Sequence, residues 1–145
     1  MPKSPTSWEH SVKVLLDTHI AIWAIAGAAS LPETARKIIL DRDNEIYVSD
    51  ISAWEIAIKS VARPGSIPFA SGDFIEACEK SGYRFLPVLR EAIVSYEELD
   101  YEAVGNAHRD PFDRLLIAQA KTSDMLFLTH DDVLRLYGEP HVIIV

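Results

Sequence analysis

Cysteine and long apolar runs are scarce in this 145-residue sequence, and their scarcity argues against two classes of protein. The only cysteine, Cys78, cannot form a disulfide within the chain, and no Cys/His cluster has zinc-finger spacing. An oxidising compartment is therefore not indicated, and we expect a cytoplasmic protein. No apolar run approaches the roughly 18 residues of a membrane-spanning helix, so we expect no membrane insertion.

Basic residues are also few. The chain has 14 Lys and Arg against 22 Asp and Glu, which gives a formal net charge of -8. Because contacts with phosphate groups come mainly from Lys and Arg, this balance argues against an ordinary nucleic-acid binder. A function on nucleic acid would have to account for the surplus of acid.

The remaining composition is that of an ordinary globular domain. Hydrophobic residues make up 48% and charged residues 25% of the chain, and its length is enough for one sizeable core. The first eleven residues contain two prolines and three serines and indicate a loose extension. We therefore predict a loose segment over residues 1–11 and a single domain over residues 12–145.

Strand-like and helix-like segments alternate along the chain. Short, β-prone apolar runs predict strands at residues 12–16, 45–50, 83–89, 125–129 and 141–145. Helical spacing and capping residues predict helices at residues 19–28, 32–43, 49–62, 71–82, 90–99 and 108–124, with one or two turns at 131–137. This alternation predicts a three-layer α/β/α fold with a central, mainly parallel sheet.

One predicted helix carries an apolar stripe formed by Ile51, Trp54, Ile58 and Val61. We expect this stripe to face the core. Trp54 and the earlier Trp23 are both expected to pack there, because aromatic side chains contribute much of the area of a core. The alternative is a surface for a second copy of the chain or for another protein.

Acids stand where the predicted strands end. Asp17 and Asp50 directly follow two strands, and Asp131 comes shortly after a third. Glu55 and Asp113 lie in the first turns of helices that should begin at the same edge of the sheet. Ligands of parallel sheets bind at the carboxyl ends of the strands, so these side chains could meet in one pocket.

Helix capping is the ordinary explanation for several of these acids. The segment from Ser52 to Glu55 matches a capping box. Asp110 occupies a capping position, with Asp113 in the turn that follows, and Asp131 could cap the last short helix. Taken one at a time, these acids are explained better by capping than by chemistry.

Asp17 is the exception. Thr18 could cap the following helix without it, and the apolar runs on both sides expose this carboxylate to costly desolvation. If several strand-end acids converge, their repulsion raises their pKa values unless a cation lies between them. Oxygen ligands favour Mg²⁺ or Mn²⁺ over zinc, and such ions support hydrolysis of phosphodiesters. The residues alone therefore suggest metal-assisted phosphodiester hydrolysis.

Four motifs carry a family resemblance. The segments LLDTHIAIW, SAWEIAIK, DPFDRLLIAQA and LTHDD occur in the order and rough spacing of PIN domains, across nearly the whole chain. More narrowly, the chain resembles the PIN-domain toxins of prokaryotic VapBC toxin–antitoxin pairs. That resemblance implies a small ribonuclease that forms a homodimer and is neutralised by a cognate, VapB-like antitoxin.

The resemblance also assigns metal ligands. It matches Asp17, Glu55, Asp113 and Asp131 to the four acids of the family's catalytic metal site, with Asp110 as a further candidate ligand. It implies Mg²⁺ or Mn²⁺, and in-line attack of an activated water on an RNA phosphodiester that leaves a 5′-phosphate. Neutralising four acids would reduce the net charge from -8 to -4.

Further residues are expected to support this site. Thr18, Ser52 and Thr129 look like polar residues that orient a carboxylate or a water. Candidates to hold the RNA backbone are Arg109, Arg114 and Lys59, with Arg63 nearby. The spacing of Lys59 from Glu55 equally suits a helical ion pair, which is the simpler explanation for this lysine.

Two other classes of function remain open. His19, His108 and His130 each lie close to a nominated acid, as an HD-type metal phosphohydrolase would require, although that class is all-helical and residues 125–129 resemble a strand. A non-catalytic receiver-like domain also places acids at strand ends. It needs a late lysine, however, and the last lysine here is Lys121.

Overall fold

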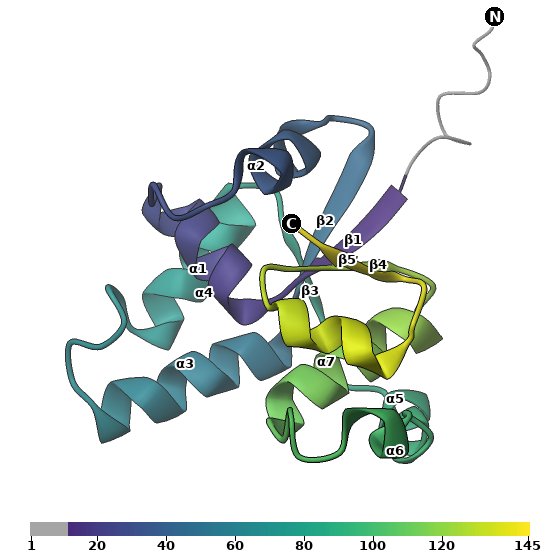
Figure 1. The fold of residues 1–145 in the computed structure, drawn as a ribbon. Coiled ribbons are helices and arrows are strands. Elements are labelled where there is room, and N and C mark those ends of the chain that lie inside the picture. Colours follow the sequence, from purple (N-terminus) through teal and green to yellow (C-terminus); the bar gives the residue numbers. More distant parts are fainter. Residues whose placement is uncertain (1–11) are drawn as a thin grey trace, which may run out of the picture.

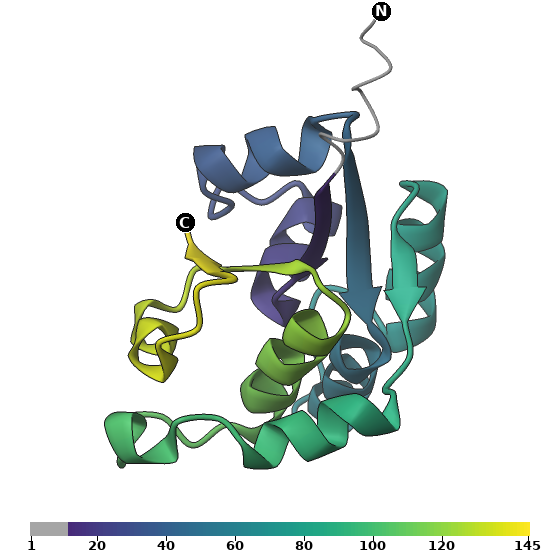
Figure 2. The ribbon, with the colours of Figure 1, turned by 90° about the vertical axis from the view of Figure 1, so that its right-hand side faces the viewer.

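The computed structural model describes residues 12–145, so the predicted extension over residues 1–11 lies outside the described part. Its centre is a five-stranded sheet in the order β3-β2-β1-β4-β5, in which every neighbouring pair is parallel. Helices cover both faces of this sheet (Figures 1 and 2). The predicted three-layer α/β/α fold with a parallel sheet is confirmed.

The strands are β1 (Val12–Leu16), β2 (Asn44–Ser49), β3 (Arg84–Leu86), β4 (Leu126–Thr129) and β5 (Val142–Ile144). The helices are α1 (Thr18–Ala26), α2 (Glu33–Leu40), α3 (Asp50–Ala62), α4 (Ser71–Lys80), α5 (Arg90–Glu97), α6 (Tyr101–Val104), α7 (Pro111–Thr122) and the 3-10 helix η3 (Asp132–Tyr137). Within residues 12–145, no helix combines the length and apolarity needed to cross a membrane.

Two element predictions were inaccurate. The strand predicted at residues 83–89 is only β3, because Pro87 follows it directly and lacks the N–H that would extend the ladder. The short helix α6 was not predicted. Asp100 caps it by accepting a hydrogen bond from the N–H of Ala103, at 2.9 Å.

The sheet separates two apolar clusters. Val14 and Leu16 of β1 point into the cluster beneath α1, α2 and α4, whereas Leu15 points into the cluster beneath α7 and η3. Burial on both faces explains why β1 is almost wholly apolar rather than alternating. Helix α3 spans the boundary, since Ile51 belongs to the second cluster and Ile56 to the first.

The apolar stripe of α3 faces outward, so the core prediction for it is wrong. Only Ile51 is buried, whereas the exposed fractions are 57% for Trp54, 39% for Ile58 and 84% for Val61. Trp23 is half-buried and packs against the first cluster, closer to expectation. The helix instead buries a face that carries a carboxylate, formed by Ile51, Ser52, Ala53, Glu55 and Ile56.

Candidate metal centre

Asp17 lies where β1 ends and α1 begins, at the carboxyl edge of the sheet. It is the N-cap of α1, so the prediction that Thr18 would cap this helix is wrong. Its Oδ1 accepts the N–H of Thr18 at 2.7 Å, and its Oδ2 accepts the hydroxyl of Thr129 at 2.6 Å. The side chain is only 5% exposed, and this burial raises its pKa, an effect that the Thr129 hydrogen bond partly offsets.

Glu55 enters the same region from α3. It is 4% exposed, and its Oε2 lies 3.0 Å from the Nζ of Lys59, as the helical spacing predicted. Its Oε1 is buried and has no hydrogen-bond partner among residues 12–145. The capping box is not formed, because Ser49 caps α3 through the N–H of Ile51. Glu55 therefore has one free buried oxygen that capping does not explain.

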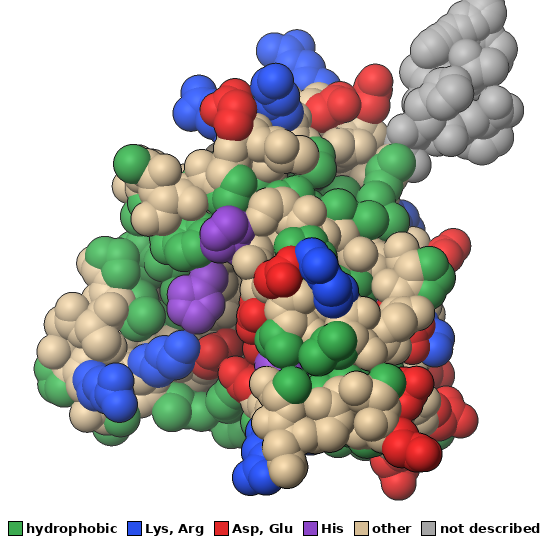
Figure 3. Space-filling model, viewed as in Figure 1, with side chains coloured by type: hydrophobic (Ala, Val, Ile, Leu, Met, Phe, Trp, Pro, Cys, Tyr) green, Lys and Arg blue, Asp and Glu red, His purple; other side chains and the backbone are tan. Residues whose placement is uncertain are grey.

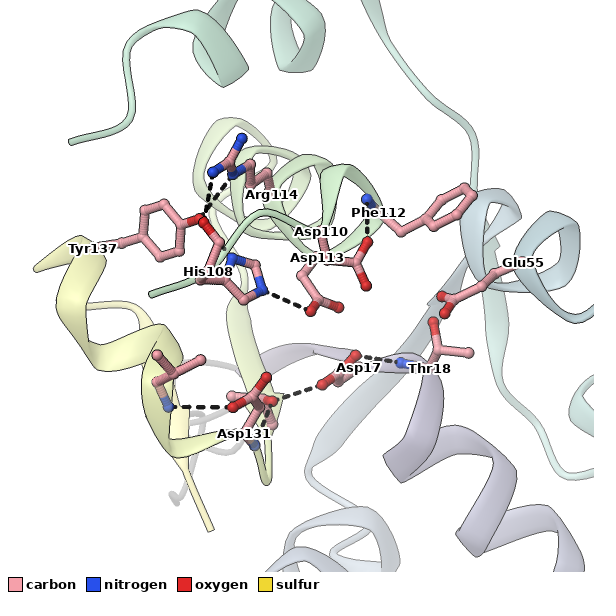
Figure 4. Close-up of polar contacts among 12 residues, drawn as sticks. Asp17, Thr18, Glu55, His108, Asp110, Phe112, Asp113, Arg114, Asp131 and Tyr137 are labelled. Carbon is pink, nitrogen blue, oxygen red and sulfur yellow. Dashed lines mark hydrogen bonds and ion pairs between the residues drawn. The ribbon is translucent and has the colours of Figure 1, made fainter. Parts of the chain in front are cut away.

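Asp113 lies in the first turn of α7, between the other acids. Its Oδ2 is 2.9 Å from Nε2 of His108. Burial first, and then the charges of nearby carboxylates, raise its pKa from 3.8 to about 8. The carboxylates responsible belong to Asp17, Asp110, Glu55 and Asp131. Figure 4 shows these side chains reaching from separate elements toward a common space.

His108 connects Asp113 to a chain of hydrogen bonds (Figure 4). Its Nδ1 is 2.7 Å from the Tyr137 hydroxyl, which accepts a hydrogen bond from Nε of Arg114 at 2.9 Å. Because Arg114 can only donate, the Tyr137 proton is free to point at Nδ1. Burial lowers the pKa of His108 and so favours the neutral ring, whose remaining proton then lies on Nε2, facing Asp113.

Asp131 and Asp110 are both helix caps, as the capping alternative predicted. Oδ1 of Asp131 accepts the N–H of Val133 at 3.2 Å, and Oδ1 of Asp110 accepts the N–H of Phe112 at 2.8 Å. Asp131 nevertheless belongs to a potential ligand group: atoms from His108, Asp113 and Asp131 all lie within 4.8 Å of one another.

His108 is the residue that sequence reasoning undervalued. It was considered only within the HD-type alternative, yet it contacts Asp113 directly. The available signal was its place in HRDPFD, five residues before that acid.

Thr129 ties two of the acids together. Its buried hydroxyl donates to Asp17 and accepts the N–H of Asp131 at 3.0 Å. The other two predicted polar residues act differently, because the hydroxyls of Thr18 and Ser52 lie 2.8 Å apart and bond to each other. They join the start of α1 to α3, while only the backbone N–H of Thr18 reaches the Asp17 carboxylate.

The nominated basic residues differ in how free they are. Arg114 bonds Tyr137, donates to the backbone oxygen of His108 at 2.7 Å and lies over the ring of Tyr101. Arg109 is exposed on its loop, and within residues 12–145 its side chain bonds only that of Asn106, at 2.7 Å. Of these two, Arg109 has the guanidinium better placed to contact a ligand, and the assignment of either to RNA stays a prediction.

This donor set suits a hard divalent cation. The free buried oxygen of Glu55 lacks a donor or a positive charge, and a cation near Asp113 would relieve the repulsion that raises its pKa. Carboxylate oxygens are the ligands preferred by Mg²⁺ and Mn²⁺, and a single imidazole beside them is compatible with Mn²⁺. The residues present therefore fit such an ion.

Comparisons with known proteins agree with this architecture. The sequence model of the PIN domain matches residues 14–140. No curated protein sequence matches the chain.

Among solved structures, VapBC2 from Rickettsia felis, bound to a promoter DNA fragment, is 16% identical with a TM-score of 0.63, over 92% of this chain and 98% of that one. DNA-bound VapBC from Salmonella typhimurium is 20% identical with a TM-score of 0.61, over 92% and 97%. VapC20 from Mycobacterium tuberculosis, described as a sarcin–ricin loop cleaving toxin, is 16% identical with a TM-score of 0.59, over 89% and 98%. At these identities the likeness concerns the fold.

Proposed function

Since this chain belongs to the PIN domain family, we propose that it is a metal-dependent endoribonuclease that hydrolyses phosphodiester bonds of RNA. The observation that carries this proposal is the buried Oε1 of Glu55, which has no hydrogen-bond partner among the described residues, in a side chain that points toward acids from other elements (Figure 4). A purely structural carboxylate would be expected to bond both of its oxygens.

Asp17, Glu55, Asp113 and Asp131 would hold Mg²⁺ or Mn²⁺, with Asp110 and His108 at the margin. When bound, the ion supplies positive charge for the scissile phosphate and lowers the pKa of an attacking water. The protein's part is orientation. Thr129 fixes the Asp17 carboxylate through its hydroxyl, Lys59 holds one oxygen of Glu55, and His108 holds one oxygen of Asp113.

The same arrangement addresses the acidic net charge. The four proposed ligands account for half of the formal charge of -8, and each bound divalent ion would offset two of these four charges. Exposed Arg109, together with Lys59 and Arg63 along α3, would then contact the RNA backbone. Attack in line with the leaving 3′ oxygen would leave a 5′-phosphate on the product.

We extend the proposal to a toxin of a type II toxin–antitoxin pair. The match covers 97–98% of the chains solved in the VapBC structures from Salmonella typhimurium and Rickettsia felis, so the likeness in fold runs over nearly their whole length. Trp54, Ile58 and Val61 of α3, together with Ile93 and Val94 of α5, are exposed apolar side chains. They supply surface that a VapB-like antitoxin and a second copy of the chain could cover.

The two alternative functions fit less well. An HD-type phosphohydrolase is all-helical, whereas strand β4 directly precedes His130, and Nδ1 of His130 bonds the backbone oxygen of Val145. A receiver-like domain has the strand order 2-1-3-4-5. The observed order β3-β2-β1-β4-β5 differs from it.

The test is RNA cleavage by the purified protein, free of any partner, with and without added Mg²⁺ or Mn²⁺. We expect cleavage only with metal, and none from Asp17→Asn. Asp50→Asn is the matched control, because Asp50 also follows a strand but is exposed and does not contribute to the raised pKa of Asp113. Cleavage in excess chelator, or full activity in Asp17→Asn, would refute the proposal.

A further inference from the structure

A hollow lies beside the proposed metal ligands, just beyond the carboxyl ends of β1 and β4. Its volume is about 300 Å³, and it is lined by Asp17, His19, Trp23, His130 and Asp131. Small-molecule pockets run from about 300 to 1,000 Å³, so this hollow suits one small ring system rather than a larger ligand. The acids on its wall are two of the proposed metal ligands.

The remaining walls are rings. Trp23 lies between two imidazoles, with centroids 6.0 Å from His19 at an interplanar angle of 49° and 5.7 Å from His130 at 70°. Neither imidazole is stacked parallel to the indole ring, and both histidines are exposed. A flat ligand can therefore stack on them, as unpaired bases do on aromatic side chains of single-strand-binding proteins.

The positions of its two histidines, and the hydrogen bond that holds one of them, make this hollow part of the proposed metal site. His19 is two residues after Asp17, and His130 stands between Thr129 and Asp131. Nδ1 of His130 is 2.5 Å from the backbone oxygen of Val145, which can only accept, so this nitrogen carries the proton. This hydrogen bond fixes the orientation of the His130 ring beside Asp131.

Charge selects the kind of ligand. Among the described residues, no Lys or Arg lines the hollow, and Lys and Arg are the residues that hold phosphate, so the hollow suits a base rather than a second phosphate. Figure 3 shows histidine side chains beside acidic ones on this face, with basic side chains gathered over α3. The rings and the cations therefore occupy different parts of the face, as base and backbone contacts would require.

We propose that the hollow formed by His19, Trp23 and His130 binds one unpaired base of single-stranded RNA, next to the phosphodiester held at the acids. This inference rests on the proposed ribonuclease function and narrows its substrate to RNA whose base at the cleaved bond is unstacked. A base inside a duplex would not reach the rings.

The first test uses a single-stranded RNA oligonucleotide that the protein cleaves, together with versions in which each base in turn is replaced by an abasic ribose. We expect one abasic position, adjacent to the cleaved bond, to raise KM about 10-fold, which corresponds to about 1.4 kcal/mol. The double variant His19→Ala/His130→Ala should show the same rise with intact RNA and no further rise with that abasic RNA. Both histidines are exposed, so this variant should fold.

The second test measures binding without cleavage. Asp113→Asn serves as the background, and the affinity for dye-labelled RNA in Mg²⁺ is followed by fluorescence anisotropy. Adding the two histidine substitutions should weaken binding of intact RNA about 10-fold and leave binding of the abasic RNA unchanged. Trp23→Phe, which keeps a ring, should retain most of the affinity. His141→Ala is the control, because His141 lines a hollow at the opposite end of the sheet.

The outcomes separate the two proposals. If no RNA is cleaved with either metal, the ribonuclease function fails, and the base site is then judged by anisotropy alone, with the abasic ribose placed at each position of the oligonucleotide in turn. Equal losses of affinity for intact and abasic RNA would mean that the rings bind the backbone, which overturns the base site. So would histidine variants that bind like the control.

Discussion

The four proposed metal ligands, Asp17, Glu55, Asp113 and Asp131, fall into two pairs that are held in different ways. Asp17, the N-cap of α1 directly after β1, and Glu55 of α3 are almost fully buried and are fixed by Thr129 and Lys59 respectively. Asp113 and Asp131 come from the starts of α7 and η3 and are more exposed. The two pairs therefore differ in burial more than in position, because Asp17, like Asp131, caps a helix that follows a strand.

The two pairs carry different free-energy costs, one from burial of charge and one from repulsion between carboxylates. Fixing Asp17 and Glu55 costs burial of charge, which the hydroxyl and the ammonium partly offset. Asp113 carries the electrostatic cost of the whole group, because its pKa rises to about 8 through burial and four other carboxylates. We therefore expect substitutions around Asp17 and Glu55 to test how the carboxylates are oriented. Substitutions at or beside Asp113 should test the repulsion between the carboxylates.

Asp113→Asn should have the largest effect and should move activity and stability in opposite directions. It removes a proposed ligand, so RNA cleavage should be abolished. In the metal-free protein, the folded-state pKa of Asp113, about 8, lies above its unfolded value near 3.8. Its contribution to stability is thus complete below pH 3.8 and is lost as the pH rises through about 8.

The measurement is Tm in excess chelator from pH 4 to 9. We expect Asp113→Asn to match the wild-type protein near pH 4 and to exceed it at pH 8 to 9. A lower Tm for the variant at pH 9 would contradict the raised pKa.

Thr129→Val tests how Asp17, one of the two buried ligands, is oriented. The change keeps the shape of the side chain but removes the hydroxyl that donates to Asp17 and accepts from the N–H of Asp131. Substituting residues that orient metal ligands costs about 10- to 100-fold in affinity or activity, and we expect a loss of that size in Mn²⁺ affinity by calorimetry. Thr122→Val is the control, since within the described part of the chain its hydroxyl bonds only backbone oxygens of its own helix. Equal affinities in both variants would show that Thr129 does not orient Asp17.

Metal binding should release a proton from the Asp113 carboxyl group. Below pH 8 the Asp113 carboxyl is largely protonated in the metal-free protein, and a ligating carboxylate must be ionised. Mn²⁺ affinity should therefore rise with pH up to about 8, by at most about 10-fold per unit, and then level off. Calorimetry in buffers of different ionisation enthalpy counts the protons released. An affinity independent of pH between 6 and 8 would contradict this assignment.

Much of the fold could be predicted because local pattern and topology agree. The apolar run of β1 predicts a strand buried on both faces, and parallel strands bring their carboxyl ends to one edge. Asp17 was correctly placed at that edge, although its role as the cap of α1 was missed. An acid can both cap a helix and face a site, so the two interpretations of Asp17 were never exclusive.

The rest depended on contacts that periodicity cannot resolve. An apolar stripe such as Trp54, Ile58 and Val61 has the same spacing whether it faces the core or another protein, and here α3 is turned so that Glu55 faces inward. The pairing of His108 with Tyr137 joins residues 29 positions apart. Nothing local in either segment indicates that contact.

Asp110→Asn should have the smallest effect, and it tests whether Asp110 is one of the metal ligands. Asn caps helices about as well as Asp, so the bond from the N–H of Phe112 and the start of α7 should be retained. The change removes one carboxylate that raises the pKa of Asp113, and that pKa should fall. RNA cleavage should drop a few-fold rather than vanish, while the pH at which Mn²⁺ affinity levels off moves lower. Complete loss of cleavage, equal to that of Asp113→Asn, would instead make Asp110 a direct metal ligand beside Asp113 and Asp131.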